Sequence, residues 1–161
     1  SNACLIKLNE PKILFSLFSI IFLFSCSNKS IPSSAKVNYL TSRDGTITMR
    51  AIGTGENQQA AIADAEKNAF EVLFFRGLPE SEQKIALIGT NEIEEKQKHQ
   101  TYFDKFYKDQ RYKTFLMSSV PTANATNIKG GSKNIAVDVK INVTALRKDL
   151  EQNNVIRKFG Y

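Results

Sequence analysis

Apolar and polar residues alternate in two segments of the chain, which is the pattern of half-buried strands. Residues 45–53 place Ile47, Met49 and Ala51 at every second position. Residues 135–143 show the clearest alternation in the chain, with an Ile or Val at every second position. We therefore predict a strand in each segment, and we expect the Gly-Thr-Gly triplet at 53–55 to end the first one.

A helical pattern follows the first strand. Small and apolar residues recur every four positions from Ala61 to Leu73, as on the buried face of a helix. We predict a helix over residues 58–76, with Asn57 as its N-cap and Gly77 beyond its end. The alanines on this face predict a close approach between the helix and a sheet.

Residues 91–107 predict a second helix, with Ile93, Phe103 and Phe106 on its buried side. Residues 112–120 read as a strand rich in aromatic and apolar side chains, and 121–133 as a polar loop. We expect this strand and 135–143 to form a long antiparallel hairpin.

The last predicted element is a short helix over residues 144–153. Thr144 is its expected N-cap, and Leu146 and Leu150 form its apolar edge. Residues 80–90 fit a short strand or a helical turn equally well, so this segment stays open between the two.

The resulting order is β-α-(short element)-α-β-β-α. Strands and helices do not alternate strictly, so the pattern favours the α+β class. We predict an antiparallel sheet of three or four strands with helices packed on one face.

The N-terminal part predicts export and lipidation. Ser1–Ala3 resembles the scar left by tag removal, and residues 13–24 form an uncharged apolar run too short for a comfortable membrane span. The run ends in Leu23-Phe24-Ser25-Cys26, which resembles the lipobox of bacterial lipoprotein signals, although Phe24 is bulkier than its usual occupant. That resemblance implies cleavage before Cys26 and lipidation of its thiol.

These features divide the chain into three parts. We predict a tag scar and signal peptide over 1–25, the lipidated Cys26 with a flexible tether over 26–44, and a single α+β domain over 45–161. The alternative for the N-terminal run is a buried helix in which Cys26 is an ordinary apolar residue. The lipoprotein interpretation places the protein on the bacterial outer membrane, facing the periplasm, with the inner-membrane leaflet and the cell surface as the other options.

Composition narrows the chemistry. The chain of 161 residues has two cysteines and one histidine, which nearly excludes a Cys/His zinc site. After removal of residues 1–25, 20 basic residues stand against 15 acidic ones, a net charge of +5. We predict no cofactor, no metal and no disulfide in the mature domain.

Basic and aromatic residues interleave in one short stretch. The candidate binding residues are Lys105, Tyr107, Lys108, Arg111, Tyr112 and Lys113. Such interleaving is typical of nucleic-acid binding, but an exported protein is expected to meet an acidic envelope polymer or another envelope protein instead. The plainer interpretation is a helix with aromatic residues in the core and lysines in water.

The chain from residue 45 to 156 resembles the N-terminal domain of flagellar assembly protein T and similar small bacterial lipoproteins. The residues that carry the resemblance are the strand at 49–55, the helix with Ala61, Ala65 and Ala69, and the segment 139–146. It implies an envelope protein that assembles or binds, and it brings no catalytic motif.

The sequence therefore leaves three functional classes open. The first is a lipid-anchored, non-catalytic interaction or assembly protein. The second is a hydrolase of an envelope polymer that uses carboxylates such as Glu92 or Asp104. The third is a small-ligand binder beneath the Gly53–Gly55 segment. His99 is expected on the polar side of the second helix, without a metal or catalytic role.

Overall fold

The computed structural model describes residues 36–158. In chain order its elements are β1 (Val37–Arg43), β2 (Thr46–Gly55), α1 (Gln58–Phe75), α2 (Glu92–Lys98), α3 (Gln100–Tyr107), the 3-10 helix η2 (Arg111–Phe115), β3 (Leu116–Pro121), β4 (Thr126–Asn127), β5 (Lys133–Asn142) and α4 (Val143–Gln152). The protein belongs to the α+β class, as the sequence predicts.

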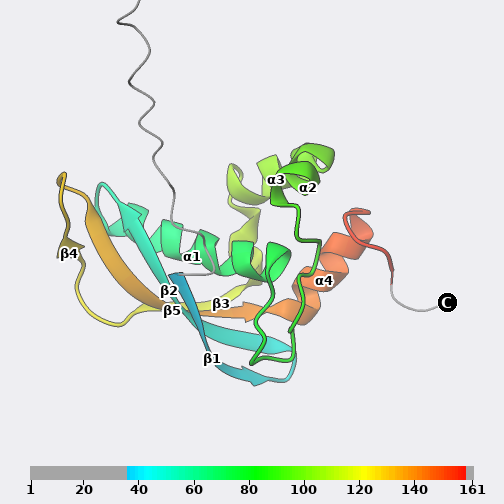
Figure 1. Cartoon of the computed structure of the whole chain (residues 1–161), viewed down its shortest axis with the longest axis horizontal. Helices are drawn as coiled ribbons and strands as arrows, with labels where there is room; N and C mark the ends of the chain where they lie inside the picture. Colours follow the sequence, from blue (N-terminus) through cyan, green and yellow to red (C-terminus); the bar gives the residue numbers. More distant parts are fainter. Residues whose placement is uncertain (1–35, 159–161) are drawn as a thin grey trace, which may run out of the picture. The chain divides into compact units, whose positions relative to one another are not determined.

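The strands form one antiparallel sheet in the order β1-β2-β5-β3, with the short β4 paired to β5 (Figure 1). β2 and β5 pair along their whole length, from Thr46 opposite Asn142 to Gly55 opposite Lys133. The described part of the chain thus has a five-stranded sheet, against the three or four strands predicted. β3 pairs with β5 as the predicted hairpin.

Two strands are missing from the prediction: the two-residue β4, which lies in the predicted loop 121–133, and β1. The residues of β1 lie in the segment 26–44, for which the sequence predicted a flexible tether, so that boundary is wrong for Val37–Arg43. β1 pairs with β2 through a tight turn at Asp44 and Gly45, both with positive φ. Only Val37 of this strand is buried, and this edge position leaves too few apolar residues for the alternation to stand out.

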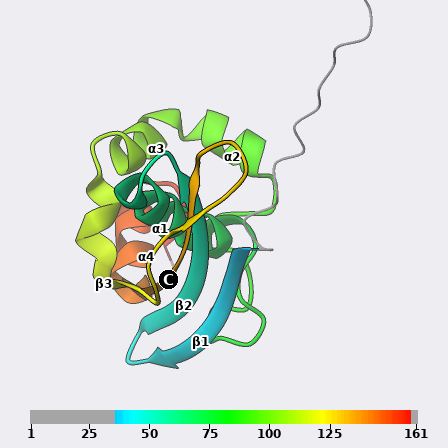
Figure 2. The ribbon, with the colours of Figure 1, turned by 90° about the vertical axis from the view of Figure 1, so that its left-hand side faces the viewer.

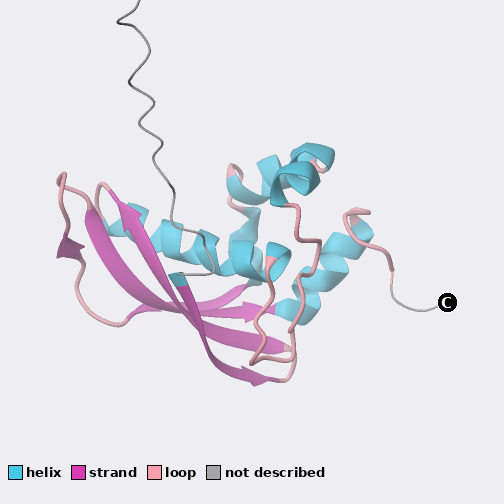
Figure 3. Ribbon diagram, viewed as in Figure 1, coloured by secondary structure: helices cyan, strands magenta, loops and turns pink. Residues whose placement is uncertain are grey.

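Helix α1 crosses the sheet (Figures 1 and 2) and contributes more buried apolar residues than any other element of the described chain. Its alanine face packs on β2 and β5, where Met49, Val137 and Val139 are fully buried. Its other side carries Phe70 and Phe74, whose rings contact the aromatic residues of α3. α1 is therefore enclosed between the sheet and α3, and α1, α2 and α3 lie on the same side of the sheet (Figure 3).

β2 continues through Gly53 and ends at Gly55, so the strand stops within the predicted triplet but runs two residues beyond the predicted range 45–53. A Cβ atom at Gly53 would lie 2.0 Å from the Ala61 carbonyl oxygen, and one at Gly55 would lie 2.6 Å from the Ala61 nitrogen. The two glycines therefore remove side chains where the backbone of α1 touches the strand.

The predicted second helix is broken. It ends at His99 and resumes as α3, and the first piece, α2, has no buried residue. Ile93, predicted to be buried, is 73% exposed, whereas Phe103 and Phe106 are buried as predicted. α2 has no apolar face that packs on the core. It is held instead by the polar contact between its Lys96 and Glu71 of α1.

The predicted strand 112–120 begins later, at Leu116. Residues 111–115 form η2 instead, because Tyr112 and Phe115 turn into the aromatic core beside Phe106. An apolar run of this length cannot by itself distinguish a strand from a turn of helix.

Helix α4 differs from the prediction only in its N-cap. It is capped by Asn142, whose side chain accepts from the Ala145 amide, and not by Thr144. Leu146 and Leu150 of α4 are fully buried, as predicted.

Residues 80–90, left open by the sequence, form neither a strand nor a helix. Leu87 from this segment is buried, while Ile85 is 75% exposed.

Candidate functional site

The predicted basic and aromatic stretch divides into two sets with opposite orientations. Its cationic residues lie at the surface: Lys105, Lys108, Arg111 and Lys113 are exposed. Its tyrosines turn inward, and each forms a hydrogen bond with a carboxylate of another element. The stretch therefore does not present a continuous surface of bases and rings to a strand of nucleic acid.

Three tyrosines anchor the α3–η2 segment to its neighbours. Tyr112 donates to Glu66 of α1 at 3.2 Å and Tyr102 donates to Asp149 of α4 at 2.8 Å, while Tyr107 donates to Glu71 of α1. The three acceptors, Glu66, Glu71 and Asp149, are all buried. Burial, together with the neighbouring Glu66 carboxylate, raises the pKa of Tyr112 to about 12, so these phenols stay protonated and remain donors.

A charge network joins α2 to α1. The Lys96 ammonium group donates to Glu71 at 2.7 Å and to Glu92 at 2.8 Å. Burial raises the pKa of Glu71, against the opposing hydrogen bonds from Lys96 and Tyr107. Burial also acts to raise the pKa of Glu92, but its bond from Lys96 and neighbouring charges outweigh this and the net pKa is lowered.

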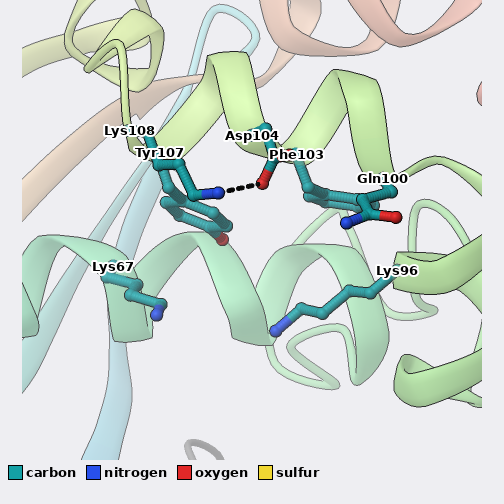
Figure 4. Close-up of a pocket in the computed structure, with 7 residues that line it drawn as sticks. All are labelled: Lys67, Lys96, Gln100, Phe103, Asp104, Tyr107 and Lys108. Atoms are coloured by element: carbon teal, nitrogen blue, oxygen red, sulfur yellow. Dashed lines mark ion pairs between the residues drawn. The ribbon is translucent and has the colours of Figure 1, made fainter.

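A hollow of about 370 Å³ lies between α1 and α3 (Figure 4). It is lined by Lys67, Lys96, Gln100, Phe103, Asp104, Tyr107 and Lys108. Three of these residues are lysines and one is a carboxylate, so the lining carries excess positive charge. Figure 4 shows Lys67 reaching in from α1 and Lys96 from α2, opposite the side chains of α3.

Each lysine of this lysine-lined hollow is held in place by a neighbour. The Lys67 ammonium lies 5.1 Å from the centroid of the Tyr107 ring, a cation–π distance. Lys108 pairs with Asp104 at 2.9 Å. Lys96 is held by the two glutamates named above. Because the cations are positioned in advance, a ligand that binds them pays less of their ordering entropy.

The carboxylates considered for hydrolysis are engaged in ion pairs. Glu92 pairs with Lys96, and Asp104 pairs with Lys108. Only Asp104 lines the hollow, so the two acids do not face a common space there, as a pair of hydrolytic carboxylates must.

Two other predicted features lie apart from the hollow's lining. The space beneath Gly53 and Gly55 is filled by the backbone of α1, so the ligand pocket expected there does not exist. His99 lies at the α2–α3 break, only 14% exposed, with Nε2 at 3.6 Å from a Glu95 oxygen. It is more buried than the sequence predicts.

The predicted lipidation residue, Cys26, lies outside the described residues. Within residues 36–158, no helix is long and apolar enough to cross a membrane.

Sequence reasoning found Tyr107 and Lys108 but missed Lys67, Lys96 and Gln100. These residues come from three helices. Phe103 and Phe106 of α3 pack on Phe74 of α1, and the Lys96–Glu71 bond joins α2 to α1, so the three residues converge. The sequence carried one usable signal for this site. Lys67 lies off the apolar face of the predicted helix 58–76, so its side chain is expected at the surface.

No family model, no curated protein and no solved structure matches this chain. The assignment of function therefore depends on the residues themselves.

Proposed function

We propose that this protein is a lipid-anchored component of a bacterial envelope whose α+β domain binds another envelope component without catalysing a reaction. The observation that carries the proposal is the apolar run 13–24 that ends in Leu23-Phe24-Ser25-Cys26. In this proposal the chain is cleaved before Cys26, acylated there, and retained at the outer membrane facing the periplasm. Several acyl chains give stable anchoring, which a single chain does not.

The described domain supports a binding function through its lysine-lined hollow. The hollow offers positioned cations, an amide and an aromatic ring, which are groups that recognise a ligand. Its acid, Asp104, is paired with Lys108 and has no partner acid in the lining. An envelope protein or an acidic polymer is the proposed partner, and nucleic acid is not.

Photocrosslinking in intact bacteria tests this function. A photoreactive residue replaces Gln100, at the rim of the hollow, or Asn124, an exposed loop residue between β3 and β4 used as the matched control. We expect a crosslinked product of higher mass from position 100, much less from 124, and loss of the product when Cys26→Ser prevents lipidation and therefore retention at the outer membrane.

The alternative results are equally informative. Equal products from both positions would show non-specific contact, and no product from position 100 would remove the hollow as the binding site. A product that persists undiminished in Cys26→Ser cells would contradict the anchoring half of the proposal.

A further inference from the structure

We infer that the lysine-lined hollow binds an acidic sugar, that is, a sugar ring bearing a carboxylate or a phosphate. This inference rests on the proposed binding function and names its ligand class. The hollow, at about 370 Å³, lies at the small end of the range of ligand pockets, about 300–1,000 Å³. It suits one monosaccharide unit, either free or within a polymer.

The cations supply recognition of the acidic group. Lys108 has only one carboxylate partner in the described residues, and Lys67 contacts the Tyr107 ring with no ion pair there. An ammonium group has more N–H donors than such contacts use. Both lysines therefore keep donors for an anion, and lysine binds carboxylate or phosphate as a point charge.

The remaining lining groups argue against a bare anion. Asp104 would repel inorganic phosphate, and the carbonyl oxygen of the Gln100 amide would be left without a donor. A sugar offers groups for both side chains, because its hydroxyl groups can donate to Asp104 and to the Gln100 oxygen and can accept from the Gln100 nitrogen. The half-buried Tyr107 ring adds an apolar surface for the carbon face of the sugar.

The position of the hollow agrees with this ligand. Its walls come from α1, α2 and α3, which the Lys96–Glu71 bond and the Tyr107–Glu71 bond tie together. The helices that carry the lining are thus held together by partly buried contacts, so their arrangement exists before a ligand arrives.

Titrations of the isotope-labelled full chain in detergent micelles, followed by NMR, test the inference. The four probes are glucuronate, glucose 6-phosphate, glucose and inorganic phosphate. We expect at least one acidic sugar to bind about tenfold more tightly than both glucose and phosphate. Compared with glucose it adds a charged hydrogen bond, and compared with phosphate it adds the contacts of its hydroxyl groups. The first two probes distinguish a carboxylate ligand from a phosphate ligand.

Variants place the binding in the hollow. Lys67→Ala and Lys108→Ala are expected to weaken binding of the acidic sugar by about tenfold each. Lys105→Ala, at an exposed lysine of α3 that does not line the hollow, is expected to leave binding of the acidic sugar unchanged. If either lysine substitution lowers the unfolding midpoint, its effect on binding cannot be separated from its effect on folding. Gln100→Ala, at an exposed position in the lining, then replaces it as the test variant.

Several results would overturn the inference. The inference fails if glucose or phosphate binds as tightly as the acidic sugars, or if no probe binds. It also fails if Lys105→Ala weakens binding of the acidic sugar as much as Lys67→Ala and Lys108→Ala do. If crosslinks from position 100 still form in cells, the proposed function stands and only the ligand class fails.

Discussion

At the scale of single residues, the domain contains three buried carboxylates that accept hydrogen bonds from tyrosines. Glu66, Glu71 and Asp149 are each less than a tenth exposed, and a buried carboxylate without partners is costly. Tyrosines satisfy all three, and Lys96 and Arg111 add positive charge to Glu71 and Asp149. The tyrosines of the predicted binding stretch therefore act in folding, while its lysines remain available to solvent.

Lys96→Met tests the value of the charge network. The substitution leaves the Glu71 carboxylate buried without its cation, so we expect a loss of about 1–3 kcal/mol in the free energy of unfolding. Urea denaturation measures the change. Lys98→Met, at an exposed position on the same helix, is the matched control and should shift the value by less than about 0.5 kcal/mol. Equal effects of the two variants would show that the network contributes nothing.

The raised pKa of Glu71 predicts a pH dependence of stability. Between the unfolded and folded pKa values, the folded protein binds more protons than the unfolded chain, so the contribution of Glu71 to stability falls as pH rises. Glu71→Gln removes this titration. The free energy of unfolding of the variant minus that of the wild type should therefore increase with pH across that window.

Denaturation at a series of pH values from about 4 to about 8 measures the difference. Glu92→Gln should give the opposite slope, because its folded pKa is lowered and its contribution is lost as pH falls. Glu56→Gln, at an exposed position, serves as the control. Parallel curves for Glu71→Gln and the wild type would contradict the assignment.

At the scale of elements, the central contact is the one between α1 and β2. The helix approaches the strand so closely that no side chain fits at Gly53. This contact fixes where α1 lies on the sheet, and with it the position of Lys67.

Gly53→Ala should therefore be severely destabilising. The new Cβ would fall 2.0 Å from the Ala61 carbonyl oxygen and 2.3 Å from the Ala65 nitrogen, so the backbones must separate. We expect a loss of about 3 kcal/mol or more in thermal or urea unfolding. Gly89→Ala, whose Cβ would meet nothing closer than 3.7 Å, should change stability by less than about 1 kcal/mol. A Gly53→Ala variant as stable as Gly89→Ala would disprove the close contact.

The same scale shows what sequence patterns can and cannot predict. The alternation around Met49 and Val139 and the alanine stripe predict β2, β5 and α1, because one periodic face of each packs on the core. β1 and α2 lack such a face: Val37 is the one buried residue of β1, and α2 has none. Such elements are held by backbone pairing or by ion pairs, which leave no hydrophobic period in the sequence.

The candidate site follows the same rule. Lys105, Lys108, Arg111 and Lys113 are recognised as surface cations from their own segment, but the hollow needs Lys67 and Lys96 as well. Their convergence depends on aromatic packing between α1 and α3, illustrated by the ring centroids of Phe70 and Phe106 at 5.2 Å. Contacts between distant segments of this kind have no local signature.

At the scale of the whole molecule, the proposed function combines a lipid anchor in the N-terminal segment with a binding domain. The charge of +5 after cleavage and the lysine-lined hollow suit an acidic partner in the envelope. In this proposal the anchor determines where the domain works, and the hollow determines what it binds there.

The most direct test is the intact mass of the protein purified from a bacterial envelope, beside Cys26→Ser and the control Cys4→Ser. We expect the wild type and Cys4→Ser to begin at Cys26 and to carry the added mass of acyl chains. Cys26→Ser should retain the residues before position 26 and carry no lipid. If the wild type also keeps those residues and has no added mass, the protein is not a lipid-anchored envelope component and the account is wrong.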